Sequence, residues 1–232
     1  LFINDGTGHF TDQTATRLPM RIDQTEGFAV GDIDRDGDLD LVVVNIGQDF
    51  VLINDGSGHF TDETLGRFPT TTDSTRKGVL ADFNGDGSLD LFMGNSRNEQ
   101  SRLYFNNGHG VFSDVTANKF PAAPHTTTHV EVVDLDNDGD RDLYLVNAGA
   151  FETGHGFVGE QNIYLRNNGH GKFKDKTEVH FPEVADPSTD ATFGDVDGDG
   201  DLDLLVGNSS SVNGELTLYI RRRCPGAEHN CQ

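Results

Sequence analysis

The stretch that decides the fold is Gly27-Phe-Ala-Val-Gly-Asp-Ile-Asp-Arg-Asp-Gly-Asp-Leu-Asp-Leu41, in which a short apolar segment runs into an acidic loop. Its loop pattern, Asp-x-[Asp/Asn]-x-Asp-Gly-x-x-Asp, occurs four times. The copies begin at Asp32, Asp82, Asp134 and Asp195, so successive copies are 50, 52 and 61 residues apart. A fixed motif that returns at this spacing indicates a repeat protein.

A second motif, Asn-[Asp/Asn]-Gly-x-Gly-x-Phe, keeps the same spacing. Its copies begin at Asn4, Asn54, Asn106 and Asn167, again 50, 52 and 61 residues apart. Because two independent motifs share one set of offsets, chance similarity is an implausible origin for them. The Asn-Asp-Gly and Asn-Asn-Gly steps are typical of tight β-hairpin turns.

Each repeat predicts four short strands rich in β-branched and aromatic residues. In the first repeat these are strand A (Phe28–Gly31), strand B (Leu39–Asn45), strand C (Phe50–Ile53) and strand D (Phe60–Thr64). Strand B is continuously apolar after Asp40, as expected when both faces of a sheet are covered. No window has a sustained helical period with caps, so we expect essentially no helix.

The predicted fold class is all-β, a β-propeller of four-stranded antiparallel blades. A β-solenoid with long rungs is the competing architecture. The chain supplies about four blades and a partial blade at each end, because it begins at a C strand and its last strand, Leu216–Ile220, is also of type C. These ends are expected either from a cut propeller or from blades completed by another chain. Residues 1–221 form the blades, and residues 222–232 form a tail in which Cys224 and Cys231 are either bridged or free.

The acidic loops predict four calcium sites, because Ca²⁺ takes six to eight hard oxygen ligands and alternate residues of a tight loop aim carboxylates at one centre. The seventh residue of each loop would contribute its main-chain carbonyl. The predicted ligand sets are Asp32, Asp34, Asp36, Asp38 and Asp40; Asp82, Asn84, Asp86, Ser88 and Asp90; Asp134, Asp136, Asp138, Asp140 and Asp142; and Asp195, Asp197, Asp199, Asp201 and Asp203.

These loops differ from EF-hands, because no Glu stands at the twelfth position and strands flank them. The alternative interpretation is a solvated acidic turn, but five carboxylates within nine residues of the first loop repel one another unless a cation is bound. Mg²⁺ fits less well because it requires a strict octahedron. The second loop has Asn84 and Ser88 in place of Asp, and we expect it to be the weakest site.

Residues 27–41 and their three partner stretches resemble FG-GAP/VCBS-type repeats, the calcium-loop β-propeller blades of integrin α-subunit heads, some fungal lectins and many bacterial surface proteins. The resemblance covers almost all of residues 1–221. It implies calcium in each A–B loop, an extracellular setting, and binding or adhesion. Seven blades are common in the family, and this chain departs from that number.

The composition excludes several classes of function. With 17 basic and 39 acidic residues, the formal charge is −22, which disfavours nucleic-acid binding and anionic membrane surfaces. No apolar run approaches the roughly 20 residues needed to span a bilayer. The sequence has no nucleophile elbow, no zinc-protease motif and no phosphate loop, so we expect a protein that is not an enzyme.

Strand parity predicts two different faces. The acidic loops and the turn histidines His9, His59, His109 and His170 share one face, and the long connecting segments 15–26, 65–77, 117–128 and 178–190 lie on the other. Each segment carries an apolar-Pro step that we interpret first as packing. We therefore expect a carbohydrate or protein ligand on the face opposite the calcium loops.

The longest insertion, residues 147–162, carries Phe151, His155 and Phe157, which are candidate ligand contacts; the alternative is a variable surface loop. Asn208 begins the sequence's N-glycosylation sequon, consistent with a secreted protein. The leading functional hypothesis is an extracellular calcium-stabilised binding module. The alternatives are a structural protomer of an extracellular filament, assembled through its partial blades, and a domain of a polysaccharide-active enzyme.

Overall fold

The computed structural model describes residues 1–121, 123–153, 156–209 and 216–220. Three antiparallel sheets of four strands follow one another along the chain, and a three-stranded sheet comes last. We call them the first to fourth units. They comprise β3 (Thr25–Gly31), β4 (Asp40–Asn45), β5 (Phe50–Asn54) and β6 (Phe60–Asp62); β7 (Thr75–Ala81), β8 (Asp90–Asn95), β10 (Arg102–Asn106) and β11 (Phe112–Asp114); β13 (Thr127–Val133), β14 (Asp142–Asn147), β17 (Ile163–Arg166) and β18 (Lys174–Asp175); and β19 (Ser188–Gly194), β20 (Asp203–Asn208) and β21 (Leu216–Tyr219).

Three two-stranded pairs accompany the units. An N-terminal hairpin precedes the first unit. A short pair links the B–C connection of the second unit to the segment that leads into the third unit. A hairpin forms within the long insertion of the third unit. Their strands are β1 (Phe2–Asn4) and β2 (Phe10–Asp12), β9 (Glu99–Gln100) and β12 (Pro124–His125), and β15 (Ala150–Glu152) and β16 (Gly156–Val158).

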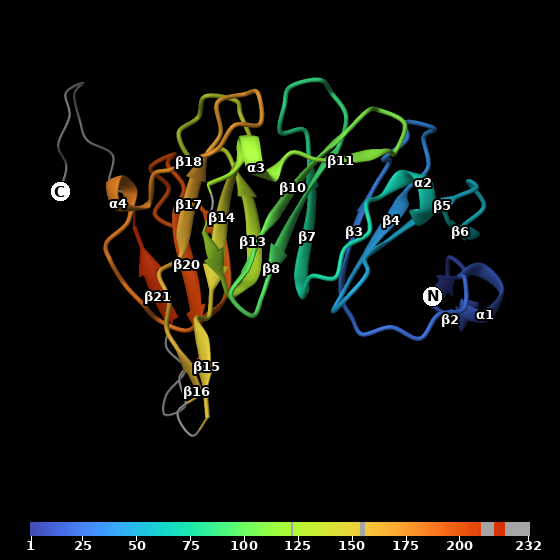
Figure 1. The fold of residues 1–232 in the computed structure, drawn as a ribbon, viewed down its shortest axis with the longest axis horizontal. Coiled ribbons are helices and arrows are strands. Elements are labelled where there is room, and N and C mark those ends of the chain that lie inside the picture. Colours follow the sequence, from blue (N-terminus) through green and yellow to red (C-terminus); the bar gives the residue numbers. More distant parts are fainter. Residues whose placement is uncertain (122, 154–155, 210–215, 221–232) are drawn as a thin grey trace.

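The units are the blades of a β-propeller, which confirms the predicted fold class. Each complete unit pairs its strands in the order A-B-C-D, and Figure 1 shows the sheets side by side in chain order. The A strands β3, β7, β13 and β19 contact one another in sequence, so they line one common side. The predicted partial blades are also present: β1–β2 corresponds to a C–D pair, and β19–β21 corresponds to A, B and C.

The hydrophobic core lies between the units. Leu91 and Met93 of β8 pack toward the first unit, whereas Phe92, between them in the chain, packs toward the third. All three side chains are buried. Period-two alternation places successive side chains on opposite faces, and a neighbouring unit covers each face. This explains why the B strands read as continuous apolar runs.

The described structure is all-β, as predicted, apart from four short turns that the sequence analysis did not identify. A four-residue turn follows each D strand, and it is helical except in α2, where Leu65 and Gly66 have non-helical backbone angles. The leading Thr hydroxyl of the last three turns accepts an N–H from the C strand, as Thr64 does from Val51 at 3.0 Å. Asp62 in turn accepts the N–H of Thr64 at 3.0 Å. A single turn is too short to give a periodic signal. The turns are α1 (Thr14–Arg17), α2 (Thr64–Arg67), α3 (Thr116–Lys119) and α4 (Thr177–His180).

The apolar-Pro steps pack as predicted. Phe68 and Phe120 are buried between units. The side-chain amide of Gln48 donates to the carbonyl of Pro69 at 3.3 Å, and Gln100 and Gln161 make the same bond to Pro121 and Pro182. Within the described part of the chain, no helix has the length and apolar character needed to cross a bilayer.

Candidate metal centres

The four acidic loops join the A strand of each unit to its B strand. In the first loop the carboxylate of Asp32 accepts the N–H groups of Asp36 and Gly37, both at 3.1 Å. Gly37 has a φ of +97°, which glycine adopts at little cost. Each loop therefore folds back onto its first carboxylate. The same pair of bonds recurs at Asp82, Asp134 and Asp195.

Three of the loops gather their carboxylates into triads. In each triad, one oxygen from every residue lies within 4.8 Å of the others. The first and fourth loops use their first, third and fifth residues, whereas the third loop uses its first, third and ninth. The triads are Asp32, Asp34 and Asp36; Asp134, Asp136 and Asp142; and Asp195, Asp197 and Asp199.

Two oxygens in these triads have no hydrogen-bond partner among the described residues. Oδ1 of Asp34 and Oδ1 of Asp136 are buried and accept no hydrogen bond from the described residues. A buried acceptor without a partner costs about 1–3 kcal/mol, more when charged. Clustered carboxylate oxygens are hard donors that suit Ca²⁺, so the residues present fit this ion.

The second loop is poorer in carboxylates. Asn84 stands at the third position, where its Oδ1 accepts the N–H of Asp86 at 2.8 Å. Among the described residues, this loop forms no acidic triad of the kind found in the other three. The prediction that it is the weakest calcium site is not decided by this geometry and stays a prediction.

The ninth residue of the first three loops has a structural role that the sequence analysis missed. Both oxygens of Asp40 accept main-chain N–H groups, from Ile33 at 3.1 Å and from Asn54 at 2.9 Å. Asp40 is fully buried, and burial raises its pKa. The carboxylate thus ties the acidic loop to the C–D turn. Asp90 and Asp142 make the equivalent bonds, and burial raises the pKa of Asp90 to about 7.

The seventh residue, predicted to offer its carbonyl, also touches the C–D turn through its side chain. A Cβ placed on Gly56 would lie 2.4 Å from Oδ2 of Asp38, and one on Gly169 would lie 2.7 Å from Oδ1 of Asp140. Both glycines also have a positive φ, +80° and +72°, a backbone conformation that favours glycine. The contacts place the A–B loop and the C–D turn at the same end of the first and third units, as strand parity predicted.

The turn histidines make local contacts. Nδ1 of His9 lies 3.0 Å from the hydroxyl of Thr7, and Nδ1 of His59 lies 2.8 Å from that of Ser57. These are hairpin contacts of the kind predicted for turn residues. Within the described residues, neither histidine belongs to a group that could hold a metal ion.

The predicted ligand residues lie on the third unit's insertion. Phe151 of β15 pairs in register with Phe157 of β16, and Figure 1 shows this hairpin extending away from the sheets. His155 lies outside the described residues. The predicted glycosylation site, Asn208, donates its amide to Thr217 at 3.1 Å and accepts from Ser188 at 2.8 Å; its modification stays a prediction.

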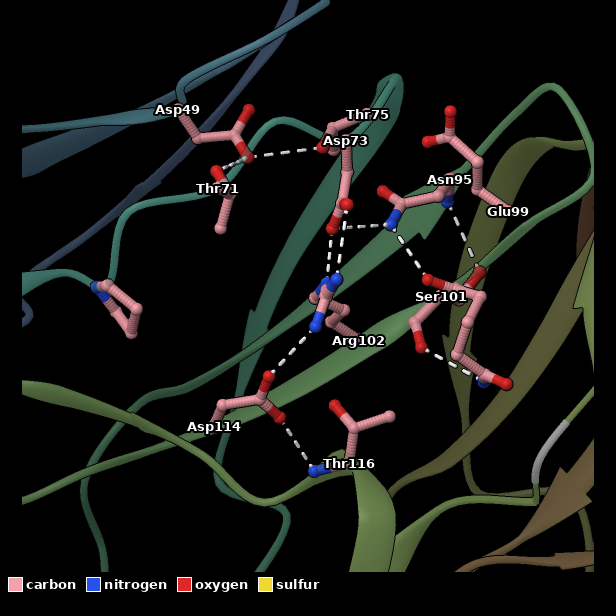
Figure 2. A network of polar contacts seen from close by, with 12 residues as sticks. Asp49, Thr71, Asp73, Thr75, Asn95, Glu99, Ser101, Arg102, Asp114 and Thr116 are labelled. Atoms are coloured by element: carbon pink, nitrogen blue, oxygen red, sulfur yellow. Dashed lines mark hydrogen bonds and ion pairs between the residues drawn. The ribbon is translucent and has the colours of Figure 1, made fainter.

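A polar network lies at the opposite end of the first two units, where the B strands finish. Figure 2 shows Arg102 between Asp73 and Asp114. A guanidinium nitrogen lies 3.1 Å from an oxygen of each carboxylate. Asn95 donates to Asp73 at 3.2 Å, but its Oδ1 is buried and accepts nothing from the described residues.

Asp49 anchors the same network from the first unit. It is fully buried and accepts hydroxyl hydrogen bonds from Thr75 at 3.1 Å and Thr71 at 3.3 Å. Thr75 begins β7, and Thr71 lies in the segment that leads to it. Burial raises the pKa of Asp49 to about 6, although the N–H of Asn45 and the two hydroxyls oppose this shift. The sequence analysis did not identify this inter-unit contact, because no recurring motif marks Asp49.

Comparison with known proteins identifies the repeats. A family model described as FG-GAP-like repeat matches residues 1–43, 36–93, 82–145 and 155–206. No curated protein matches the chain in sequence.

Among solved structures, one similar chain is a lectin from Agrocybe aegerita that specifically recognises non-reducing terminal N-acetylglucosamine. The identity is 22%, the TM-score is 0.42, and the match covers 82% of this chain and 50% of the lectin. The chain thus spans about half the length of that structure.

Proposed function

Because the chain belongs to the FG-GAP-like repeat family, we propose that it is a calcium-stabilised binding module that works outside the cell. The observation that carries this proposal is the set of three acidic triads, two of which contain a buried oxygen that has no hydrogen-bond partner in the described part of the chain. The ligand sets predicted from the sequence, with four Ca²⁺ ions, are retained in full.

Calcium bound in these loops would supply positive charge where carboxylates crowd together. The chain's own residues hold the loops in place: the first Asp of each loop holds the turn, and in the first three loops the ninth residue ties the loop to the C–D hairpin. At a free calcium concentration about ten times Kd, each occupied site adds roughly 1.4 kcal/mol of stability. The millimolar calcium of the extracellular space suits sites of modest affinity, which supports the proposed location.

Calorimetric calcium titration of the wild type and of an Asp34→Ala, Asp36→Ala variant tests the metal sites. We expect the variant to bind one ion fewer, because it loses two members of the first triad. An Asp5→Ala, Asp55→Ala variant is the matched control, since it removes two exposed carboxylates from C–D turns. Equal stoichiometry in wild type and first-loop variant would refute the assignment.

We place the ligand on the face opposite the acidic loops, where a carbohydrate or a protein would contact the β15–β16 hairpin. The support is geometric, since this hairpin interrupts the B–C connection of the third unit and extends away from the sheets. A glycan array in millimolar calcium tests the carbohydrate form of the proposal. Binding should be lost in a Phe151→Ala, Phe157→Ala variant and kept in Phe10→Ala, and binding by the hairpin variant as strong as that of wild type would contradict it.

A second candidate function is a protomer of an extracellular assembly. A cavity of about 250 Å³ lies at the fourth unit, lined by Leu135, Phe181, Phe193, Leu204 and Tyr219 among others. Phe112 and Phe173 fill the corresponding places between the earlier units. Light scattering over a range of concentrations tests this candidate, and a monomer at every concentration, with and without calcium, would exclude it.

A further inference from the structure

One basic residue reaches into the third acidic loop. Arg166 ends strand β17, the C strand of the third unit. Its Nε lies 2.5 Å from Oδ2 of Asp136, and a terminal guanidinium nitrogen donates to Oδ2 of Asp138 at 2.9 Å. The guanidinium therefore bridges the third and fifth residues of the loop, both of which are predicted calcium ligands.

No other complete unit carries a cation at this position. The B–C registers pair Leu143 with Leu165 in the third unit, Leu41 with Leu52 in the first, and Leu91 with Tyr104 in the second. The residue that follows each of these C-strand partners is the equivalent of Arg166. It is Ile53 in the first unit and Phe105 in the second.

The third loop also arranges its carboxylates differently. The first and fourth triads use the fifth residue, Asp36 and Asp199, whereas the third triad uses the ninth residue, Asp142, in place of Asp138. Asp138 is the carboxylate that Arg166 holds. At the same time Oδ1 of Asp136 stays buried without a partner from the described residues, so the arginine satisfies only part of the site.

The first loop has a nearby arginine of another kind. A guanidinium nitrogen of Arg67 lies 3.4 Å from Oδ2 of Asp34. The same guanidinium is bound to Glu63 at 2.7 Å and donates to the carbonyl of His109 in the next unit. Arg67 is therefore held by groups outside the loop. All the contacts described for Arg166 are with loop carboxylates.

We propose that Arg166 is a tethered counter-ion of the third loop, which Ca²⁺ must displace from Asp136 and Asp138 before these residues can act as ligands. This inference rests on the proposed calcium sites. It makes the third loop weaker than the first and fourth, which have the same number of Asp side chains at the predicted ligand positions. The sequence analysis expected a weak site only in the second loop, because of Asn84 and Ser88. The contacts of Arg166 indicate that calcium binding in the third loop is weakened as well.

The effect has a defined size and direction. An exposed or half-buried ion pair contributes up to about 1 kcal/mol, so its removal should raise the affinity of the third site by up to about fivefold. Salt screens such pairs. Added NaCl should therefore reduce the difference in calcium affinity at the third loop between wild type and an Arg166→Gln variant.

The experiment is a calcium titration of the full chain. Calorimetry measures the binding, and amide NMR signals report on each loop separately through its glycine: Gly37, Gly87, Gly139 and Gly200. We expect Arg166→Gln to strengthen the site reported by Gly139 and to leave the others unchanged. Arg141→Gln is the matched control, because it removes one exposed positive charge from the same loop. It should change the affinity of this site less than twofold.

The outcomes separate the two proposals. If wild type binds calcium in the loops but Arg166→Gln and Arg141→Gln alter the third site equally, the tethered counter-ion is refuted and the calcium proposal stands. If wild type and Arg166→Gln bind no calcium in any loop, both are refuted. Binding at the third loop only in Arg166→Gln supports the inference in its strongest form. A cooperative thermal unfolding transition in calcium-free buffer establishes that both variants are folded.

Discussion

The side-chain amide of Asn106 donates to the main-chain carbonyl of Ile33 at 2.7 Å, across the boundary between the second unit and the first. Asn167 makes the same bond to Phe83 at 2.8 Å across the next boundary. The second motif therefore does more than form a turn. In the second and third units, its Asn connects the C–D turn to the acidic loop of the preceding unit.

Asn106→Ala should destabilise the fold by about 2–4 kcal/mol, because it leaves buried main-chain groups without partners. Asn106 also donates to Leu89 at 3.1 Å and accepts from Gly108 and Gly110, each at 3.0 Å. Chemical denaturation in saturating calcium measures the loss. Asn4→Ala is the matched control, since Asn4 is exposed and its described bonds are those accepted from Gly6 and Gly8. If Asn4→Ala destabilises the fold as much as Asn106→Ala does, the loss of stability comes from the turn and not from the inter-unit hydrogen bond.

The last residue of the same motif allows a second comparison. Phe173 is 5% exposed and packs against Phe83 and Phe120 at ring-centroid distances of 5.7 Å and 6.2 Å, whereas Phe10 in the N-terminal hairpin is 63% exposed. Phe173→Ala should cost about 3–5 kcal/mol, because it opens a cavity in the core. Phe10→Ala should cost much less. Thermal unfolding of the two variants distinguishes them, and equal destabilisation would contradict the packing model.

The sequence predicts the local structure well here because the same pattern of strand and turn residues occurs in four repeats. The strands of the first repeat begin and end within a few residues of their predicted bounds. The acidic loops and C–D turns stand where the motifs place them, because glycine and aspartate at fixed offsets determine the backbone of a tight turn.

Contacts between repeats were beyond the sequence analysis. The bond from Asn106 to Ile33 joins residues far apart in the chain, and repetition alone does not indicate which neighbour a side chain reaches. Arg166 escaped notice because it breaks the repeat pattern at a single position, and its meaning depends on the register of β14 with β17. The helical turns escaped because four residues carry no period.

The second loop can be strengthened by one substitution. Asn84→Asp would give it a carboxylate at the third position, as in the other three loops. Because ligand charge tunes calcium affinity, we expect the affinity of this site to rise on the order of tenfold. Titration followed at Gly87 measures the change. Asn107→Asp, which adds a carboxylate in the C–D turn of the same unit, controls for general charge; an equal response would show that the third position is not a ligand.

The buried carboxyl of Asp49 predicts a pH dependence of stability. Its pKa is raised to about 6 in the folded protein from 3.8, so the folded state holds the proton more tightly than the unfolded state. The resulting stabilisation is present below pH 3.8 and is lost as the pH rises through 6. Asp49→Asn should therefore gain stability relative to wild type over this window, by up to about 3 kcal/mol.

The third unit supplies the reciprocal test, because Asn162 occupies the position of Asp49. Asn162 accepts the N–H of Asn147 at 2.8 Å, and its amide donates across the unit boundary to Ser188 at 2.9 Å. Asn162→Asp should introduce the pH dependence that Asp49→Asn removes, since a buried carboxylate at this boundary is costly only when ionised. Urea denaturation at pH 4, 5, 6 and 7 in saturating calcium compares the three proteins. Parallel pH profiles would mean that the carboxyl group at neither position has a different pKa in the folded and unfolded states.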